Sequence, residues 1–342
     1  MQDNPPDVFV PNLVVAAYFA GRWVKAAGIP TIGILHSDDA FYRGIQDEFV
    51  FGRKDYRVTA LACVSEELER QVTKRQPETT AIRRIPYGVV IPKRKVERNP
   101  GRLRLAYVGR FAEEQKRVSD LTRALCHAVR YVPGAEAVLY GDGPDRNAVE
   151  DILNNEGMGL PVILAGRVGS DEIQAHLLEC DVLVLLSDYE GLPIALLEAM
   201  ACGVVPVCLR MRSGVSELIE DGVTGLVVDN RNEAFIHAVT RLQNEAGLWG
   251  KLSTAARAKV ESEFSHEASV NKWANLFRKL GDQSRQKSKI QIPRKYRLPP
   301  VNSALSSADP RPHEIPMPLR WYRKGRMFAG RIRRRMLGQT IP

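Results

Sequence analysis

Short apolar, β-branched runs alternate with helix-like patterns along most of this chain of 342 residues. Such an alternation is typical of a parallel β-sheet whose strands are joined by crossover helices. A basic, proline-containing stretch at 91–101 divides the alternation into two parts. We therefore expect an α/β fold of two successive doubly wound domains. Ligands should bind in the cleft where the carboxyl ends of their strands face each other.

The sequence pattern predicts fewer strands and helices in the first part than in the second. The first has expected strands at 7–10, 31–35 and 60–64 and helices at 13–27, 41–51 and 66–74. The second has expected strands at 103–109, 135–140, 162–166, 182–186 and 204–209, helices at 119–131, 147–155, 170–178, 194–202 and 216–220, then a loop at 224–229 and helices at 233–245, 249–263 and 264–280. This order predicts domains at 1–95 and 96–263, a helix at 264–282 that packs back toward the first domain, and a tail at 283–342.

The first domain is short for this architecture, because doubly wound domains usually carry about five or more strands. The expected strand at 7–10 is apolar on both faces, as a central strand would be, yet no strand precedes it to cover its edge. Two interpretations are open. Either the chain is an N-terminally shortened version of a longer protein, or a partner chain supplies the missing strands.

Charge is distributed unevenly along the chain. The net charge is +9 at pH 7, but residues 283–342 hold fifteen Lys and Arg against Asp309 and Glu314. Residues 1–282 therefore hold 34 basic and 38 acidic residues, a net charge of −4. The globular part is mildly acidic and no recognised nucleic-acid-binding module accompanies the basic tail, so we expect no nucleic-acid partner.

The tail is rich in proline and basic residues, which predicts an extended or disordered segment as far as Met317. Beyond it, basic residues alternate with Trp321, Phe328, Ile332 and Met336, and this pattern predicts an amphipathic helix over 319–337. Such a helix can lie on an anionic membrane surface. A solvated tail is the alternative on composition alone.

The five cysteines are scattered through apolar contexts, and no two of them form a C-x-x-C pair. This usage indicates reduced, buried thiols in a cytoplasmic protein. We find no secretory signal in the sequence and no apolar stretch long enough to span a bilayer. We therefore expect a cytoplasmic protein that is peripheral on the inner face of the membrane if the tail binds lipid.

Two carboxylates, Glu190 and Glu198, stand in the otherwise apolar segment 187–203. Pro193 fits the first turn of a helix, and the following run is apolar on nearly every face except at Glu198, so this helix should be largely buried. A buried carboxylate without partners is energetically costly. Either Glu198 reaches solvent or pairs with a basic side chain, or both glutamates accept hydrogen bonds from ligand hydroxyls, which we favour.

Cations follow the first strand of the second part. Gly109 and Arg110 close that strand, and Lys116 precedes the next expected helix. Neither a GxGxxG fingerprint nor a P-loop is present there, which argues against hydride transfer and nucleoside triphosphate hydrolysis. Arg110 and Lys116 are either ordinary surface charges or, because their loop lies opposite the expected helix start at 191–194, a diphosphate clamp. We favour the clamp.

The order of these features is specific, although the glycine-rich turn at 141–144 is a weak signal by itself. The chain resembles the family 4 retaining glycosyltransferases (glycosyl transferases group 1) over roughly residues 7–280, most strongly over 105–229. The resemblance implies a GT-B fold, in which two Rossmann-type domains face each other. The second would hold a nucleotide sugar and the first an acceptor. The features that carry the resemblance are, in chain order, Gly109-Arg110, Lys116, Gly141-Asp142-Gly143-Pro144, Ser187 with Glu190, Glu198 after seven intervening residues, and Glu217 before an Asp-Gly turn.

The resemblance also implies roles for individual side chains. Arg110 and Lys116, beside Gly109, would hold the diphosphate. Glu198 would bind the ribose hydroxyls, and Glu190 would bind hydroxyls of the transferred sugar. Charge develops on the leaving diphosphate, so the two cations and the helix N-terminus would stabilise it. The acceptor hydroxyl would attack from the same face with retention of configuration, and no protein nucleophile would be needed.

Backbone and first-domain groups complete the implied site. The amides of Gly191 and Leu192 would point at sugar and phosphate, and Val168 lies where the base-contacting loop of the family lies. His36, at the end of an expected strand, matches a histidine that faces the reaction centre in the family; a structural role is the alternative. No cluster has metal-ligand spacing, so we expect no metal and no cofactor besides a UDP- or GDP-linked donor substrate.

The sequence departs from the family pattern at two positions. Arg117 stands where the family usually has glycine, and Ser216 replaces a common proline. The family's first strand and its glycine-rich loop have no counterpart before Asp7. The function we expect is retaining transfer of a sugar from a nucleotide diphosphate donor to a glycan or lipid-linked acceptor. The alternative is a non-catalytic nucleotide-sugar-binding subunit or a truncated pseudoenzyme.

Overall fold

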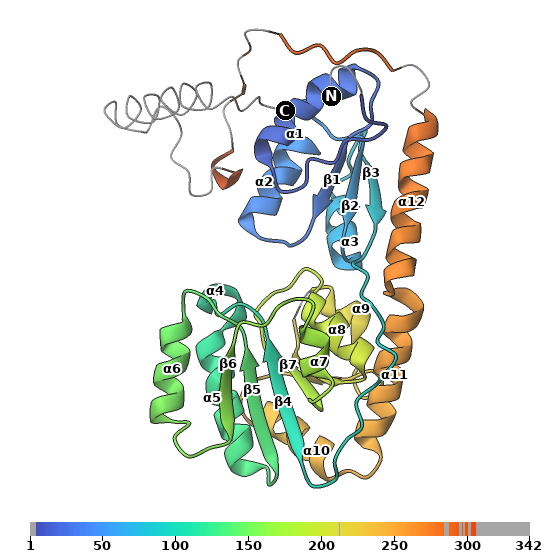
Figure 1. The fold of residues 1–342 in the computed structure, drawn as a ribbon. Coiled ribbons are helices and arrows are strands. Elements are labelled where there is room, and N and C mark those ends of the chain that lie inside the picture. The colour runs from blue at the N-terminus through green and yellow to red at the C-terminus, as the bar shows by residue number, and fades with distance from the viewer. Residues whose placement is uncertain are drawn as a thin grey trace, which may run out of the picture.

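The chain has two parallel β-sheets, one in residues 5–95, which we call the first half, and one in residues 96–263, which we call the second half. The two halves lie one above the other (Figure 1). The computed structural model describes residues 5–211, 213–283, 287–293, 296, 298–299 and 302–305. Both halves place helices on the faces of their sheet, as the alternating sequence pattern predicts. The predicted α/β class with two Rossmann-type units is therefore confirmed.

The first sheet has three parallel strands in the order β1-β2-β3. Each of the four residues of β1 and of β2 is buried, which fits strands covered on both faces. Asp39 caps α2, the helix after β1, by accepting a hydrogen bond from the amide of Tyr42. Ser65 caps α3, the helix after β2, by accepting one from the amide of Leu68. In chain order the elements are α1 (Val15–Ala26), β1 (Ile32–Leu35), α2 (Ala40–Phe49), β2 (Ala60–Cys63), α3 (Glu66–Lys74) and β3 (Ala81–Arg84).

The prediction of a central strand at 7–10 is wrong. This segment makes one parallel bridge, between Phe9 and Thr31, beside β1. Pro11 and Leu13, whose φ is 59°, then turn the chain, so the pairing does not extend. Sequence analysis also missed β3, because its arginines leave it half-buried and without an apolar run.

The second sheet has six parallel strands in the order β6-β5-β4-β7-β8-β9. The chain builds outward from β4 in one direction and then returns to build outward from β7 in the other. The point between β4 and β7 is a topological switch, where open α/β sheets bind ligands. The strands are β4 (Leu103–Val108), β5 (Ala135–Tyr140), β6 (Val162–Gly166), β7 (Val182–Leu185), β8 (Val205–Leu209) and β9 (Leu226–Val228).

The helices of the second half match the expected ranges closely, with two differences. The short helix α4 was not predicted, and the helix expected at 170–178 begins three residues later. The loop expected at 224–229 contains the edge strand β9, which pairs only with β8. The helices are α4 (Glu113–Lys116), α5 (Val118–Tyr131), α6 (Arg146–Asn155), α7 (Ile173–Leu177), α8 (Ile194–Cys202), α9 (Val215–Leu218), α10 (Glu233–Asn244) and α11 (Leu248–Glu263).

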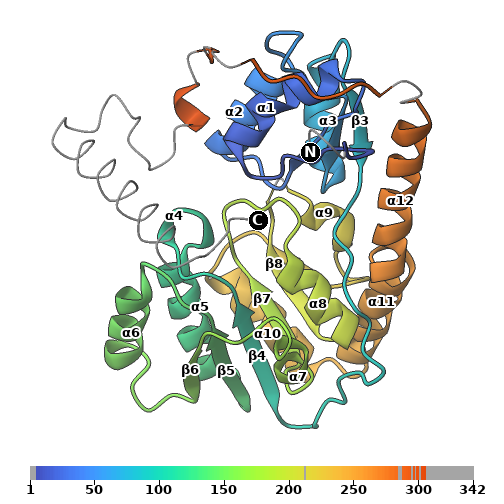
Figure 2. The same cartoon turned by 45° about the horizontal axis from the view of Figure 1, so that its top comes forward.

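The last long helix, α12 (His266–Gln283), leaves the second half and runs beside β3 of the first half (Figures 1 and 2). Where it begins, Val89 forms a parallel bridge with Ser265. The hydroxyl of Ser269 donates a hydrogen bond of 2.8 Å to the carbonyl of Pro86. The chain therefore crosses between the halves twice at one place.

Part of the basic tail packs on the first half, although sequence analysis expects extended or disordered chain there. Ile290 is 3% exposed, in a cluster with Val24, Ala27 and Ile29. The ring of Tyr296 meets that of Trp23 edge-on, 4.8 Å apart. The short helix η1 (Ser303–Leu305) lies against α2. The amphipathic helix predicted over 319–337 lies outside the described residues.

All five cysteines are buried, as the sequence predicts, and none of them is in a disulfide. Of the helices that the structure describes, none is long and apolar enough to cross a membrane.

Candidate functional site

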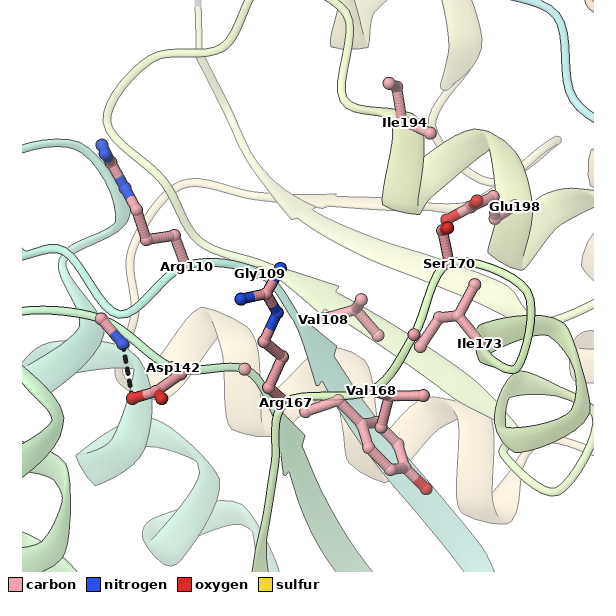
Figure 3. A pocket seen from close by; sticks show the side chains of 14 residues that line it. Val108, Gly109, Arg110, Asp142, Arg167, Val168, Ser170, Ile173, Ile194 and Glu198 are labelled. Atoms are coloured by element: carbon pink, nitrogen blue, oxygen red, sulfur yellow. Dashed lines mark hydrogen bonds between the residues drawn. The ribbon is translucent and has the colours of Figure 1, made fainter. Parts of the chain in front are cut away.

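A pocket of about 880 Å³ opens at the carboxyl ends of β4, β5 and β6 (Figure 3). This volume lies in the range of roughly 300–1,000 Å³ that small-molecule sites occupy. The pocket lies next to the topological switch point of the second sheet. Its walls are three strand-end loops and the beginnings of α7 and α8: Val108, Gly109, Arg110, Tyr140, Gly141, Asp142, Gly143, Arg167, Val168, Gly169, Ser170, Ile173, Ile194 and Glu198.

Glycines allow these loops to stack backbone on backbone. The amide of Gly109 donates to the carbonyl of Tyr140 at 3.0 Å, and that of Gly141 donates to the carbonyl of Gly166 at 2.8 Å. A Cβ on Gly141 would lie 1.9 Å from the carbonyl oxygen of Gly109, and one on Gly143 would lie 2.2 Å from that of Phe111. The Gly-Asp-Gly-Pro turn is therefore required for the shape of the pocket floor.

Two arginines line the pocket, and sequence analysis named only one of them. Arg110 follows β4, and Arg167 follows β6. In Figure 3 both side chains rise from the strand-end loops, away from the sheet. The missed signal was a repeated pattern, because Arg167 follows the strand-end glycine Gly166 just as Arg110 follows Gly109. Two guanidinium groups suit an anion with several oxygens, such as a diphosphate.

Glu198 lines the opposite wall of the pocket, on α8. Figure 3 shows Glu198 and Ser170 among the side chains that line the pocket. Burial raises the pKa of Glu198. Among the residues that the structure describes, no Lys, Arg or His forms an ion pair with it. The interpretation that Glu198 pairs with a basic side chain therefore has no support in the described chain, and its carboxylate faces the pocket.

Glu190 and Lys116 lie outside the residues that line this pocket and contact each other. Lys116 Nζ and Glu190 Oε1 are 2.5 Å apart, and the two side chains are 16% and 6% exposed. The side-chain amide of Gln115 also donates to Glu190 Oε2, at 3.3 Å. The structure thus separates the two expected diphosphate cations, because Arg110 is among the residues that line the pocket whereas Lys116 pairs with a buried carboxylate.

The residue that follows Lys116 has a left-handed backbone conformation. Arg117 ends α4 with φ at 50°, a conformation that costs a non-glycine residue roughly 1–2 kcal/mol. The guanidinium of Arg117 forms an ion pair of 2.6 Å with Asp120. The departure from the family's glycine is therefore accommodated here, with the charge of Arg117 used in a local ion pair.

His36 lies at the end of β1, where the first half touches the second. A Cβ on Gly191 would lie 2.0 Å from the carbonyl oxygen of His36. On its other side, Gly191 accepts a hydrogen bond of 2.8 Å from the amide of Gly214. The structure therefore brings His36 next to Gly191, the neighbour of Glu190. Leu192, which follows, is buried.

Glu217 connects the halves electrostatically. Its carboxylate accepts a hydrogen bond of 3.1 Å from the amide of Glu66, at the start of α3. It also pairs with Arg84 of β3 at 2.6 Å. Burial raises the pKa of Glu217, and the Arg84 guanidinium and the Glu66 amide oppose this shift. The acidic residue that sequence analysis used only as a pattern element is thus an interdomain contact.

Within residues 5–211, 213–283 and the short described segments that follow, no three His, Cys, Asp or Glu side chains converge to hold a metal ion. The expectation of a metal-independent site remains a prediction.

Residues 102–245 match the family model described as glycosyl transferases group 1. An alpha-D-kanosaminyltransferase from Streptomyces kanamyceticus is 31% identical over 176 residues, which are 51% of this chain and 45% of that protein. A GDP-mannose-dependent alpha-(1-6)-phosphatidylinositol dimannoside mannosyltransferase from Mycobacterium tuberculosis is 29% identical over 264 residues, 70% of this chain and 66% of that protein. Over the first of these alignments, the chain spans about half the length of its relative.

Solved structures share the fold. The pneumococcal O-GlcNAc transferase GtfA, in complex with UDP and GlcNAc, has a TM-score of 0.64 at 18% identity, over 75% of this chain and 54% of that one. The sucrose-phosphate synthase of Thermosynechococcus elongatus has a TM-score of 0.63 at 19% identity, over 77% and 72%. Together with the two facing sheets, these neighbours confirm the expected GT-B-like fold.

Proposed function

Residues 102–245 belong to the glycosyl transferases group 1 family, and on this premise we propose that the protein transfers a sugar from a UDP- or GDP-linked donor to a glycan or lipid-linked acceptor. The observation that carries the proposal is the pocket at the switch point of the second sheet. It offers guanidinium groups on one side and a carboxylate on the other, which suits a nucleoside diphosphate.

The donor is proposed to lie across the pocket in one orientation. Its diphosphate is bound by Arg110, with Arg167 as a second cation. Its ribose hydroxyls donate to Glu198, whose carboxylate faces the pocket, and its base lies against the loop at Val168. The N-terminus of α8 adds partial positive charge near the phosphates, because its first amides have no partner within the helix.

The transferred sugar is proposed to reach the Glu190–Lys116 pair. Glu190 accepts hydrogen bonds from sugar hydroxyls, while Lys116 pairs with that carboxylate and places a positive charge near the leaving diphosphate. The backbone amides of Gly191 and Leu192 face the sugar and the phosphate. His36 belongs to the first half, the proposed acceptor side, and its carbonyl packs on Gly191 of the second half.

Retention of configuration is the mechanism we propose. As the glycosidic bond breaks, negative charge grows on the diphosphate, and cations already in place stabilise it without reorganisation. The acceptor hydroxyl attacks the anomeric carbon from the face that the diphosphate leaves. Its proton passes to a departing phosphate oxygen, so neither a protein nucleophile nor a metal is required.

Calorimetric titration with UDP- and GDP-sugars, followed by donor-turnover assays, tests the proposal. Arg110→Ala should weaken nucleotide binding and lower turnover by about 100-fold, because one preorganised cation is lost. Arg123→Ala is the matched control, since Arg123 pairs with Glu156 on the protein surface away from the pocket. Unchanged turnover in Arg110→Ala would refute the assigned role.

The three-stranded first sheet favours a second candidate, a nucleotide-sugar-binding subunit without turnover of its own. In that case a partner chain supplies strands or a loop that the first half does not contain. Binding of a nucleotide sugar without turnover, restored by a second protein, would support the subunit.

Peripheral binding to an anionic membrane through the tail at 283–342 also remains a proposal, together with a cytoplasmic location. It suits a lipid-linked acceptor. Flotation with anionic liposomes should be lost when the tail is removed, and flotation that persists would exclude this role of the tail.

A further inference from the structure

Three polar side chains from separate segments of the first half converge at the interdomain contact. Tyr87 comes from the stretch after β3, and its hydroxyl is hydrogen-bonded to Nδ1 of His36. Asn12 comes from the turn before α1, and its Oδ1 lies 2.8 Å from Nε2 of His36. The imidazole and phenol rings are nearly parallel, with an interplanar angle of 10°. Both ring nitrogens therefore have a side-chain partner.

The chemistry of these partners determines the tautomer. With the Asn12 amide oriented so that Oδ1 faces the ring, that oxygen can only accept, so Nε2 of His36 carries a hydrogen and donates it to Asn12. In a neutral imidazole, Nδ1 is then an acceptor, and the hydroxyl of Tyr87 must be its donor. Burial raises the pKa of Tyr87 to about 12, so this hydroxyl retains its proton at neutral pH.

The surroundings of His36 favour the neutral ring. Burial lowers its pKa. From α2, Tyr42 meets the imidazole edge-on, and Asp39 lies near Tyr42 as the cap of that helix. From the second half, Gly191 packs on the His36 carbonyl, and the preceding residue, Glu190, is paired with Lys116. A protonated ring would have no free lone pair on Nδ1 and would lose the hydrogen bond from Tyr87.

We propose that Tyr87 is a positioning residue for His36, holding it as the neutral tautomer with its proton on Nε2 at the mouth of the sugar site. The inference rests on the proposed transferase function and adds a residue to it. In this state the one ring hydrogen of His36 is donated from Nε2 to Asn12, so the ring donates to a substrate oxygen only where that oxygen takes the place of Asn12. It does not act as a base through Nδ1, because the Tyr87 hydroxyl occupies that lone pair.

The test combines a spectroscopic readout with kinetics. Protein labelled with ¹⁵N in its six histidines reports which ring nitrogen of each is protonated, and His36→Gln assigns the signal. We expect His36 to show a protonated Nε2 and a bare Nδ1. In Tyr87→Phe we expect a mixture of tautomers and a higher pKa for His36, because the hydrogen bond to the neutral form is gone.

The loss of the Tyr87 hydroxyl should also slow sugar transfer. In Tyr87→Phe, kcat for sugar transfer should fall by about 10-fold with little change in the donor KM, as misplacement of a reacting-site group does. The acid limb of the pH profile should move to higher pH. Tyr42→Phe is the control, because Tyr42 contacts the same imidazole through its ring. It should leave the tautomer unchanged.

The outcomes separate this inference from the proposed function. A protonated Nδ1 in the wild type, or an unchanged His36 signal in Tyr87→Phe, overturns the positioning role. If the tautomer behaves as expected but no donor is turned over, the contact stands and the transferase proposal fails. If turnover occurs and Tyr87→Phe leaves both kcat and its pH profile unchanged, the positioning role is refuted for catalysis.

Discussion

The two halves of the molecule contribute to the site in different ways. The second half lines the whole pocket, with Arg110 and Arg167 on its strand-end loops and Glu198 on α8. The first half has three strands and contributes the end of β1, where the His36 carbonyl meets Gly191. Donor binding should therefore depend on one half alone, whereas transfer should depend on the contact between them.

The largest effect is expected within the second half, at the buried ion pair. Lys116→Ala leaves Glu190 buried without its counter-charge, which should lower the free energy of unfolding by about 3 kcal/mol. Transfer should fall by about 1,000-fold, the upper range for a lost electrostatic group. Chemical denaturation and initial-rate assays measure both.

The double variant Lys116→Ala with Glu190→Gln is the control for this pair. It removes the unpaired charge, so stability should largely return while the rate stays low. Equal stability of the single and double variants would contradict the assignment of a buried charge pair.

The second-largest loss of transfer is expected for a substitution at the contact between the halves. A methyl group on Gly191 would lie 2.0 Å from the His36 carbonyl oxygen, so Gly191→Ala must push the halves apart. We expect transfer to fall by about 100-fold, because the reacting groups move out of register. Nucleotide affinity, measured by calorimetry, should change little.

Gly250→Ala provides a matched substitution, because a Cβ there meets no atom within 4 Å and the residue lies inside α11. It should preserve transfer and slightly stabilise the helix. A loss of nucleotide affinity in Gly191→Ala equal to its loss of rate would show that donor binding needs both halves.

A smaller effect is expected at the pocket carboxylate. Burial raises the folded-state pKa of Glu198 above its unfolded value. Its contribution to stability is therefore present below the unfolded pKa and is lost as the pH rises through the folded one. Glu198→Gln should weaken nucleotide binding by about 10-fold. It should also raise the melting temperature relative to the wild type, increasingly so from acid toward neutral pH.

Glu245 is the control, because its pKa is shifted in the opposite direction: the hydrogen bond with Arg241 lowers it. Glu245→Gln should therefore show no gain in melting temperature as the pH rises. Parallel melting curves for the two variants across this pH range would contradict the burial of Glu198.

The smallest effect on the site is expected from the tail. Ile290→Ala removes a buried side chain from the cluster on α1 and should destabilise the first half by about 2 kcal/mol. Nucleotide affinity should not change. Ile292→Ala, at a position that is 47% exposed, should have almost no effect. Hydrogen exchange of α1 and α2 distinguishes the two variants, and equal exchange would show that the tail does not support the first half.

The regular helices and strands of the second half were predictable because short stretches of sequence mark where each of them begins and ends. The strand at 135–140 and the helix at 194–202 are bounded by glycine, proline or charge, and the structure has them at the predicted residues. The three-residue strand β9 lies between turn residues, so no periodicity marks it. The segment at 7–10 has the composition of a strand, but whether it pairs depends on its neighbours.

The candidate site was predictable as a set of residues and not as a set of contacts. Arg110 and Glu198 face one pocket, as the order of strands and loops implies. The ion pair between Lys116 and Glu190 joins residues 74 positions apart, so no local pattern in the sequence marks it. Likewise, no local pattern connects Tyr87 to His36, because their hydrogen bond arises only when three segments fold together.

The paired crossing at Val89 and Ser265 has a mechanical consequence. The amide of Val89 donates to the carbonyl of Phe264, and the amide of His266 donates to the carbonyl of Val89, so the two connections between the halves are joined side by side. Because both connections between the halves pass through this hydrogen-bonded place, we expect any change in the angle between the halves to be a rotation about it.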